Sequence, residues 1–282
     1  MVTFACMFRG HCDPGLTRAR GRNGVKLGGM RLASPFSDVQ AIVFDLDDTL
    51  CNYWDAAKAG LRAAFHDVAW PEPVTEDQFV AAWAEAFRDF CPTLKKTGWY
   101  ETYLKTGEPT RTETMRHALR ILNLDNDALA REVSDAYHAQ RQAHLRLFEE
   151  VSATLDALAA HFPFGLMTNG PADIQRDEIA VLGLEGRFQV VLIEGEVGRG
   201  KPHEVVFRQA ESALNCAPAN LLMVGNSYHH DIVPAIEYGW QTAWIRRPSD
   251  VPPSSTTGRP EERPEGGPEP TAIITGLDQL LA

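Results

Sequence analysis

The sequence predicts an α/β protein whose parallel sheet is covered by helices on both faces. From residue 151 onward, short apolar segments alternate with amphipathic helical segments, and one further apolar segment, AIVFDL (residues 41–46), precedes them. This alternation is typical of strand–helix–strand units with both faces of the sheet buried. Residues 53–149 lie between these parts and show helical periodicity with no strand pattern. We therefore expect a Rossmann-like core with a helical domain inserted after its first strand.

The helical insertion is predicted from three segments. TEDQFVAAWAEAFRDF (75–90) opens with a capping box, Thr75 with Gln78, and then places aromatic residues at helical spacing. RTETMRHALRILNL (111–124) and DALAREVSDAYHAQRQAHLRLF (127–148) continue the helical pattern. We assign residues 53–149 to this α-helical domain.

The remaining core elements follow in helix–strand order. Helix 153–162 leads to strand 164–169, helix 173–184 to strand 188–193, helix 203–214 to strand 221–226, and helix 231–239 to strand 242–247. The segment TAIITGLDQLLA (271–282) supplies a last strand and helix. Residues 37–52 and 150–282 therefore form the core. Residues 248–270, rich in Pro, Gly and charge, are predicted to be a flexible loop within it.

The N-terminal residues 1–36 are rich in Gly and Arg and lack periodicity, which predicts a disordered tail. They contain no apolar stretch of the kind that a secretory signal requires. A translation start at Met30 would give a more compact chain, and this alternative stays open.

Composition excludes several classes of protein. The chain of 282 residues has 38 Asp and Glu against 27 Lys and Arg, which argues against nucleic acid as the main partner. No apolar run approaches the roughly 18 residues of a membrane span. The five cysteines are scattered and odd in number, so we expect free thiols and a cytoplasmic location. Cys51 has no activating His or Lys beside it in sequence, so packing is favoured over a role as a thiol nucleophile.

Polar residues gather where the predicted strands end. Asp45, Asp47 and Asp48 crowd the end of the first strand, and such crowding raises the pKa of at least one carboxyl group. Ligands of open parallel sheets bind outside the carboxyl ends of the strands. The other polar groups at strand ends or in the loops that follow are Thr168, Asn169, Lys201, Asn226, Ser227 and Asp231. We expect these groups to form one site.

Four motifs in this order resemble those of the haloacid dehalogenase superfamily: DLDDT (45–49), TNG (168–170), GKP (200–202) and GNSYHHD (225–231). The resemblance covers about residues 40–250, and the helical insertion is similar to the α-helical cap of the phosphoglycolate phosphatase-like branch. It implies a Mg²⁺-dependent phosphatase, monomeric or homodimeric, that acts on a small phosphorylated metabolite. Phosphoglycolate, sugar phosphates and nucleoside monophosphates are candidate substrates.

The resemblance also implies a role for each motif residue. Asp45 is the expected nucleophile that forms an aspartyl-phosphate, and Asp47 protonates the leaving oxygen and then deprotonates water. Thr168 and the backbone N–H groups around Asn169 would hold the phosphoryl oxygens, and Lys201 would neutralise Asp45 and the phosphate. Asp45, through its carboxylate, and Asp47, through its main-chain carbonyl, would bind Mg²⁺.

The fourth motif departs from the family pattern. Most members carry Gly-Asp where this chain has Gly225-Asn226, and an amide oxygen can ligate Mg²⁺ but brings no charge. Asp231 matches the second acid of the motif, which usually lies in the outer shell of the metal. His229 and His230 stand beside it as possible ligands, although a place on the helix surface is favoured.

Three other functions stay open. A haloacid dehalogenase-type hydrolase is disfavoured because those relatives lack the second Asp, having no leaving oxygen to protonate. A catalytically weak regulatory or binding relative is suggested only by Asn226. A phosphomutase, whose aspartyl-phosphate resists water, is also not excluded by the sequence.

Overall fold

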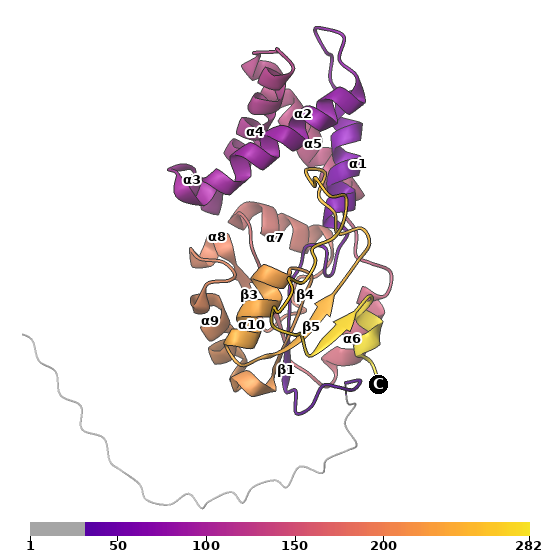
Figure 1. Ribbon diagram of the computed structural model, residues 1–282, viewed down its shortest axis with the longest axis vertical. Helices are drawn as coiled ribbons and strands as arrows, with labels where there is room; N and C mark the ends of the chain where they lie inside the picture. The colour runs from indigo at the N-terminus through magenta and orange to yellow at the C-terminus, as the bar shows by residue number, and fades with distance from the viewer. Residues whose placement is uncertain (1–31) are drawn as a thin grey trace, which may run out of the picture.

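The computed structural model describes residues 32–282 and has six parallel strands in one sheet (Figure 1). The strand order is β3-β2-β1-β4-β5-β6, and every neighbouring pair is parallel. The strands are β1 (Ala41–Phe44), β2 (Phe164–Thr168), β3 (Val190–Ile193), β4 (Leu221–Gly225), β5 (Gln241–Ile245) and β6 (Ala272–Ile274). This confirms the predicted fold class.

Helices cover both faces because alternate residues of each strand point to opposite sides. Ile42 and Phe44 of β1 pack into one apolar cluster with α6 (Val151–Ala159) and α7 (Ala172–Val181). Ala41 and Val43 pack into a second cluster with α9 (Glu204–Leu214) and α10 (Val233–Glu237) on the other face. The shorter α8 (Glu194–Val197) follows β3, and the 3₁₀ turn η2 (Pro218–Asn220) precedes β4. All of β1 is buried, as a strand covered on both faces should be.

The helical insertion rises from the carboxyl edge of the sheet and has an apolar core of its own (Figure 1). Its elements are α1 (Tyr53–Asp67), α2 (Glu76–Phe90), η1 (Cys91–Lys96), α3 (Trp99–Lys105), α4 (Glu108–Ile121) and α5 (Asp127–His144). The predicted capping box is present: Thr75 Oγ1 accepts from the N–H of Gln78 at 3.3 Å, and Gln78 Oε1 accepts from the N–H of Thr75 at 2.8 Å. We call this unit the cap.

The C-terminal half contains two helices that differ from the sequence prediction. A single π-helical turn, η3 (Tyr228–Ile232), leads into α10, so the segment predicted as one helix at 231–239 is split. The last helix is a 3₁₀ turn, η4 (Leu277–Leu280). Residues 248–270 contain no helix or strand. Between β5 and β6 this segment rises to the cap, where Arg88 Nη1 of α2 donates to the carbonyl of Ser254 at 3.2 Å (Figure 1).

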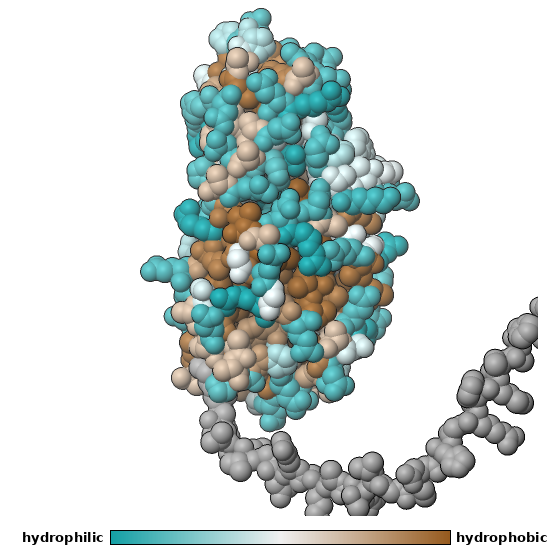
Figure 2. Space-filling view, turned by 180° about the vertical axis from the view of Figure 1, so that it is seen from behind, coloured by the Kyte–Doolittle hydropathy of each residue, from teal (hydrophilic) through white to brown (hydrophobic). Residues whose placement is uncertain are grey.

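Of the predicted tail at 1–36, residues 1–31, with Met30, lie outside the described residues. Leu32 forms an isolated β-bridge with Leu281, and the N–H of Ala33 donates to the carbonyl of Leu280 at 3.0 Å. No helix within residues 32–282 has the length and apolar character needed to cross a bilayer. Seen from behind, the surface is largely hydrophilic, with apolar residues gathered on the core below the cap (Figure 2).

Candidate active site

The sequence-predicted residues meet at the carboxyl ends of the central strands β1, β2 and β4. The chain turns to one side of β1 for β2 and β3 and to the other side for β4, β5 and β6, so the strand order reverses at this point. Crevices at such reversals are where open parallel sheets bind ligands. Asp45 follows β1, Thr168 ends β2, and Asn226 follows β4.

Asp45 lies in a buried chain of charges with Lys201 and Asp231. Lys201 Nζ lies 2.5 Å from Asp45 Oδ1 and 2.7 Å from Asp231 Oδ1. Burial raises the pKa of Asp45 to about 6, although the charge of Lys201 opposes that rise. Burial alone would lower the pKa of Lys201, but the two carboxylates raise it, so the ammonium stays charged. One buried cation thus holds two carboxylates that would otherwise repel each other.

Thr49 occupies the other side of Asp45. Its Oγ1 donates to Asp45 Oδ2 at 2.9 Å and also lies 3.3 Å from Asn226 Oδ1. A hydroxyl has one proton to donate. Two acceptor oxygens therefore converge on a single donor, and one of them is short of a positive partner.

Asp47 is held by a helix that the sequence prediction did not connect with it. Gln175, in α7, donates from Nε2 to Asp47 Oδ2 at 3.2 Å, while its Oε1 accepts from Thr168 Oγ1 at 2.6 Å. Burial raises the pKa of Asp47 well above its ordinary value, and the charges of Glu178 and Asp45 raise it further. Burial and nearby negative charge therefore favour the protonated form of Asp47.

The sequence from β1 to β5 matches a known protein family. The family model described as haloacid dehalogenase-like hydrolase matches residues 42–245. The chain is a haloacid dehalogenase-like hydrolase. The matched range runs from β1 to the end of β5 and includes the cap, as the four motifs predicted.

Curated relatives place this hydrolase with the phosphatases of the family. It is 29% identical over 233 residues to a phosphoserine phosphatase of Thermus thermophilus, covering 74% of this chain and 89% of that protein. It is 28% identical over 230 residues to an N-acylneuraminate-9-phosphatase of Rattus norvegicus, covering 78% and 88%. The predicted membership in the phosphatase branch is supported by both.

The fold itself is shared with dehalogenases. A solved 2-haloacid dehalogenase from Pseudomonas syringae pv. Tomato DC3000 superposes with a TM-score of 0.58 at 24% identity, covering 86% of this chain and 96% of that one. The fold alone therefore does not distinguish phosphate ester hydrolysis from dehalogenation, so the distinction must come from the residues of the site.

Asn169 anchors the loop that carries Lys201 in this hydrolase. Its Nδ2 donates to the carbonyl of Lys201 at 2.8 Å, and its Oδ1 accepts from the N–H of Lys201 at 2.7 Å. A Cβ at Gly200 would collide with Asn169 Oδ1, so the motif requires glycine there. The side chain of Asn169 thus positions Lys201.

The fourth motif is joined by an acid from the long loop. Asn226 Nδ2 donates to Asp250 Oδ2 at 3.0 Å, and burial raises the pKa of Asp250 to about 6. Asp231 Oδ2 accepts from the N–H of Ser227 at 2.9 Å, so both oxygens of Asp231 already have partners in the protein. Asp250 follows β5, and its contact could be inferred from the sequence only by knowing that β5 pairs with β4.

Three other residues considered from the sequence have surroundings that suit structural roles. His229 contacts Glu261 at 3.5 Å with a side chain that is 62% exposed, and His230 Nδ1 lies 3.1 Å from Ser227 Oγ. Cys51 is fully buried, and burial raises the pKa of its thiol well above the ordinary value. Within residues 32–282, no three His, Cys, Asp or Glu side chains are grouped as a metal site would need.

The cap contacts the core beside Asp47 through a buried ion pair. Arg141, in α5, lies 2.6 Å from Glu178, in α7, and its guanidinium lies 5.0 Å from the centre of the Tyr53 ring. Glu178 also accepts from Gln175 Nε2 at 3.0 Å. The chain of contacts from Arg141 to Asp47 therefore links the cap to the carboxyl group of the site.

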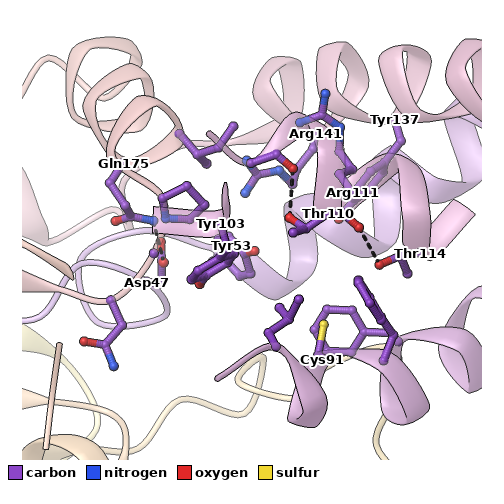
Figure 3. A pocket seen from close by; sticks show the side chains of 18 of the residues that line it. Asp47, Tyr53, Cys91, Tyr103, Thr110, Arg111, Thr114, Tyr137, Arg141 and Gln175 are labelled. Carbon is purple, nitrogen blue, oxygen red and sulfur yellow. Dashed lines mark hydrogen bonds between the residues drawn. The ribbon is translucent and has the colours of Figure 1, made fainter. Parts of the chain in front are cut away.

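A cavity of about 300 Å³ lies between the cap and the core. In Figure 3, Asp47 and Gln175 lie at one end of it, and Arg111, Thr114 and Tyr137 lie toward the other. A ligand with one group at Asp45 and Asp47 would extend through this cavity under the cap.

Proposed function

We propose that this hydrolase is a Mg²⁺-dependent phosphatase that cleaves a small phosphorylated metabolite through an aspartyl-phosphate at Asp45. The observation that carries this proposal is the pairing of two unlike carboxyl groups at one strand end. Asp45 contacts a buried ammonium, whereas burial and nearby negative charge raise the pKa of Asp47. Two carboxyl groups whose surroundings differ in this way suit a nucleophile and a general acid.

In the first step, a carboxylate oxygen of Asp45 attacks phosphorus as the bond to the leaving oxygen breaks. Asp47 gives its proton to that oxygen, so the product leaves as an alcohol. Lys201 reduces the repulsion between the anionic nucleophile and the anionic phosphate. Thr168 and the backbone N–H groups near Asn169 are proposed to hold the phosphoryl oxygens.

In the second step, water attacks phosphorus and the acyl phosphate opens. Asp47, now ionised, takes a proton from the water, and Asp45 is released as a carboxylate. Gln175 is proposed to keep Asp47 in place through both steps, because its Nε2 donates to Asp47 Oδ2. Its Oε1 accepts from the Thr168 hydroxyl until that hydroxyl turns to a phosphoryl oxygen. Atoms and protons balance over the cycle, so no other reactant is needed.

The donor set fits Mg²⁺, which prefers oxygen ligands and often uses only one or two carboxylates. Asp45 Oδ2 and Asn226 Oδ1 converge on the single hydroxyl of Thr49, which leaves one oxygen without a positive partner. We propose that these oxygens and the main-chain carbonyl of Asp47 hold the ion, with Asp231 behind them orienting Lys201. Bound there, Mg²⁺ would neutralise charge on the phosphate.

The dehalogenase alternative is less compatible with Asp47. A halide leaves as a stable anion and needs no proton, so a second carboxyl group whose pKa is raised by burial and by the charge of Glu178 would have no purpose there. The remaining alternative, a weak binding relative, rests on Asn226 alone.

The test is to incubate the protein with p-nitrophenyl phosphate and a panel of phosphorylated metabolites, with Mg²⁺ or with EDTA. We expect release of phosphate that requires Mg²⁺ and is lost in Asp45→Asn. A parallel assay measures chloride released from 2-chloropropionate. Chloride release without phosphate release would favour the dehalogenase, and neither product would favour the binding relative.

A further inference from the structure

If the proposed phosphatase function holds, the residues that line the cavity under the cap indicate which chemical groups the alcohol portion of the substrate carries. Asp47, Asn169 and Gln175 line its core end, so the alcohol portion of a phosphate ester bound at Asp45 must enter it. Its volume of about 300 Å³ is at the small end for ligand pockets. The occupant is therefore a small molecule of limited length.

Six of the seventeen remaining lining residues are aromatic. Trp83 and Phe87 stack with ring centres 4.9 Å apart on one helix of the cap. The other aromatic side chains of the lining are Tyr53, Phe90, Tyr103 and Tyr137. A polyol would lose water contacts against such a wall without replacing them, whereas a ring would stack on it.

Two arginines face this aromatic lining, and they differ in their partners. Arg141 is neutralised by Glu178 at 2.6 Å. Arg111, in α4, donates from Nε to the carbonyl and hydroxyl of Ser134, at 3.2 and 3.0 Å. Neither of these acceptors carries a charge.

The charge of Arg111 is poorly compensated. Its nearest carboxylate, Asp135, lies 3.9 Å from Nη2 and has a side chain that is 73% exposed. Its Nη1 has no hydrogen-bond or ion-pair partner among residues 32–282. Burial and the charge of Arg141 lower the pKa of Arg111, which is the effect expected of a cation without a close anion.

We propose that the substrate is a phosphate ester of a ring-bearing alcohol that carries a carboxylate, and that Arg111 binds this carboxylate. The phosphate lies at Asp45, the ring lies between the aromatic side chains, and the carboxylate reaches the guanidinium. Arg111 is then a specificity-determining residue with two free donors for a planar anion.

The test compares two synthetic esters of equal size. 4-Carboxybenzyl phosphate carries the anion, and 4-carbamoylbenzyl phosphate is its neutral counterpart, also an ester of a benzyl alcohol. We expect kcat/KM of the wild type to be about tenfold or more higher for the carboxylate ester than for the amide ester, because a hydrogen bond to a charged group stabilises a complex by enough to give such a ratio. Both esters should react faster than glycerol 3-phosphate, which brings a polyol. A carboxylate-to-amide ratio near one in the wild type overturns the proposal.

Arg111→Met tests the residue itself. The carboxylate-to-amide ratio should fall toward one, while Arg120→Met, a change at an exposed arginine of the same helix, should keep the wild-type ratio. Melting temperatures of both variants establish that they are folded. If Arg111→Met does not fold, the carboxylate-to-amide ratio of the wild type alone decides whether the proposal holds. An unchanged ratio in a folded Arg111→Met protein contradicts the assignment.

The proposed function fails in a different way. If neither benzyl ester nor p-nitrophenyl phosphate releases phosphate with Mg²⁺ present, the phosphatase proposal is wrong and this inference is wrong with it. If phosphate is released but the carboxylate confers no advantage, only the substrate class is wrong.

Discussion

Arg141 of the cap and Glu178 of the core form a buried ion pair, 2.6 Å apart, directly behind the network that holds Asp47. Removing one partner of such a pair leaves a buried charge uncompensated. We expect Arg141→Leu to lower the free energy of unfolding by about 3–5 kcal/mol, measured by urea denaturation. Arg141→Leu/Glu178→Leu should recover most of the loss, because both charges are then gone.

The matched control is Arg176→Leu, which removes an exposed ion pair with Glu196 at the same 2.6 Å distance. Exposed pairs contribute about 1 kcal/mol or less. Equal costs for Arg141→Leu and Arg176→Leu would show that the cap–core pair does not behave as a buried one.

Asp47→Asn removes the proposed general acid and keeps its size. Turnover of an alkyl phosphate should fall by about a hundredfold or more, because the alkoxide must leave without a proton. p-Nitrophenolate is a stable anion, so phosphoryl transfer from p-nitrophenyl phosphate should slow less. Single-turnover kinetics separate this step from hydrolysis of the acyl phosphate. Equal slowing of both substrates would remove Asp47 from that role.

Asp48 gives a prediction about stability and pH. Burial and the charge of Asp250 raise its pKa to about 8 in the folded protein, against the 3.8 of an ordinary carboxyl group. Between these values only the unfolded chain releases the proton, so stability falls as pH rises and levels off above about 8. The slope reaches at most about 1.4 kcal/mol per pH unit.

Asp48→Asn should flatten this pH dependence. The variant keeps a side-chain oxygen that can accept the hydrogen bond from the N–H of Trp54, which Asp48 Oδ1 accepts at 3.1 Å. The measurement is urea denaturation in EDTA from pH 6 to 9. If the wild type and Asp48→Asn have parallel pH profiles, Asp48 is ionised in the folded protein already at pH 6.

Asn226→Asp tests the contact between the fourth motif and the long loop. A second carboxylate would then lie about 3.0 Å from Asp250, so we expect a lower melting temperature in EDTA. Mg²⁺ should restore it, because a cation neutralises the pair, and the Mg²⁺ concentration at half-effect should fall by about tenfold relative to wild type. Asn226→Asp/Asp250→Asn exchanges the amide and the carboxylate of this contact, so its melting temperature in EDTA should return toward that of the wild type. A melting temperature of Asn226→Asp that is unchanged in EDTA would contradict the contact.

The sequence predicted the core of this fold well because its signals are local. Each strand is an apolar run that ends at a polar residue, as in AIVFD at β1 and LLMVGN at β4, and the order of these runs sets the parallel sheet. The cap was visible as helical periodicity without strands. The split at η3 was not visible in the sequence. It arises because the carbonyl of Ser227 accepts hydrogen bonds from the N–H groups of Asp231 and Ile232, and such local hydrogen bonds leave no periodic pattern in the sequence.

The residues that the sequence prediction missed share one property. Gln175 contacts a residue 128 positions away, and Asp250 contacts one 24 positions away. Neither lies in a motif, and a polar residue on a helix or in a Pro-rich loop is ordinarily solvated. Gln175 and Glu178 are three positions apart and so share a face of α7, which could have marked a polar stripe in an otherwise apolar interface. Only the fold shows that this face meets Asp47.

The central claim is that Asp45 carries the phosphoryl group. The most direct test is to quench the reaction in acid within the first turnover, reduce the protein with borohydride, and map the peptide that contains residues 41–50 by mass spectrometry. Borohydride converts an aspartyl-phosphate to homoserine, so the account predicts homoserine at Asp45 in the presence of substrate and none in its absence. Homoserine at another position, or an unmodified Asp45 when phosphate release shows a burst, would contradict it.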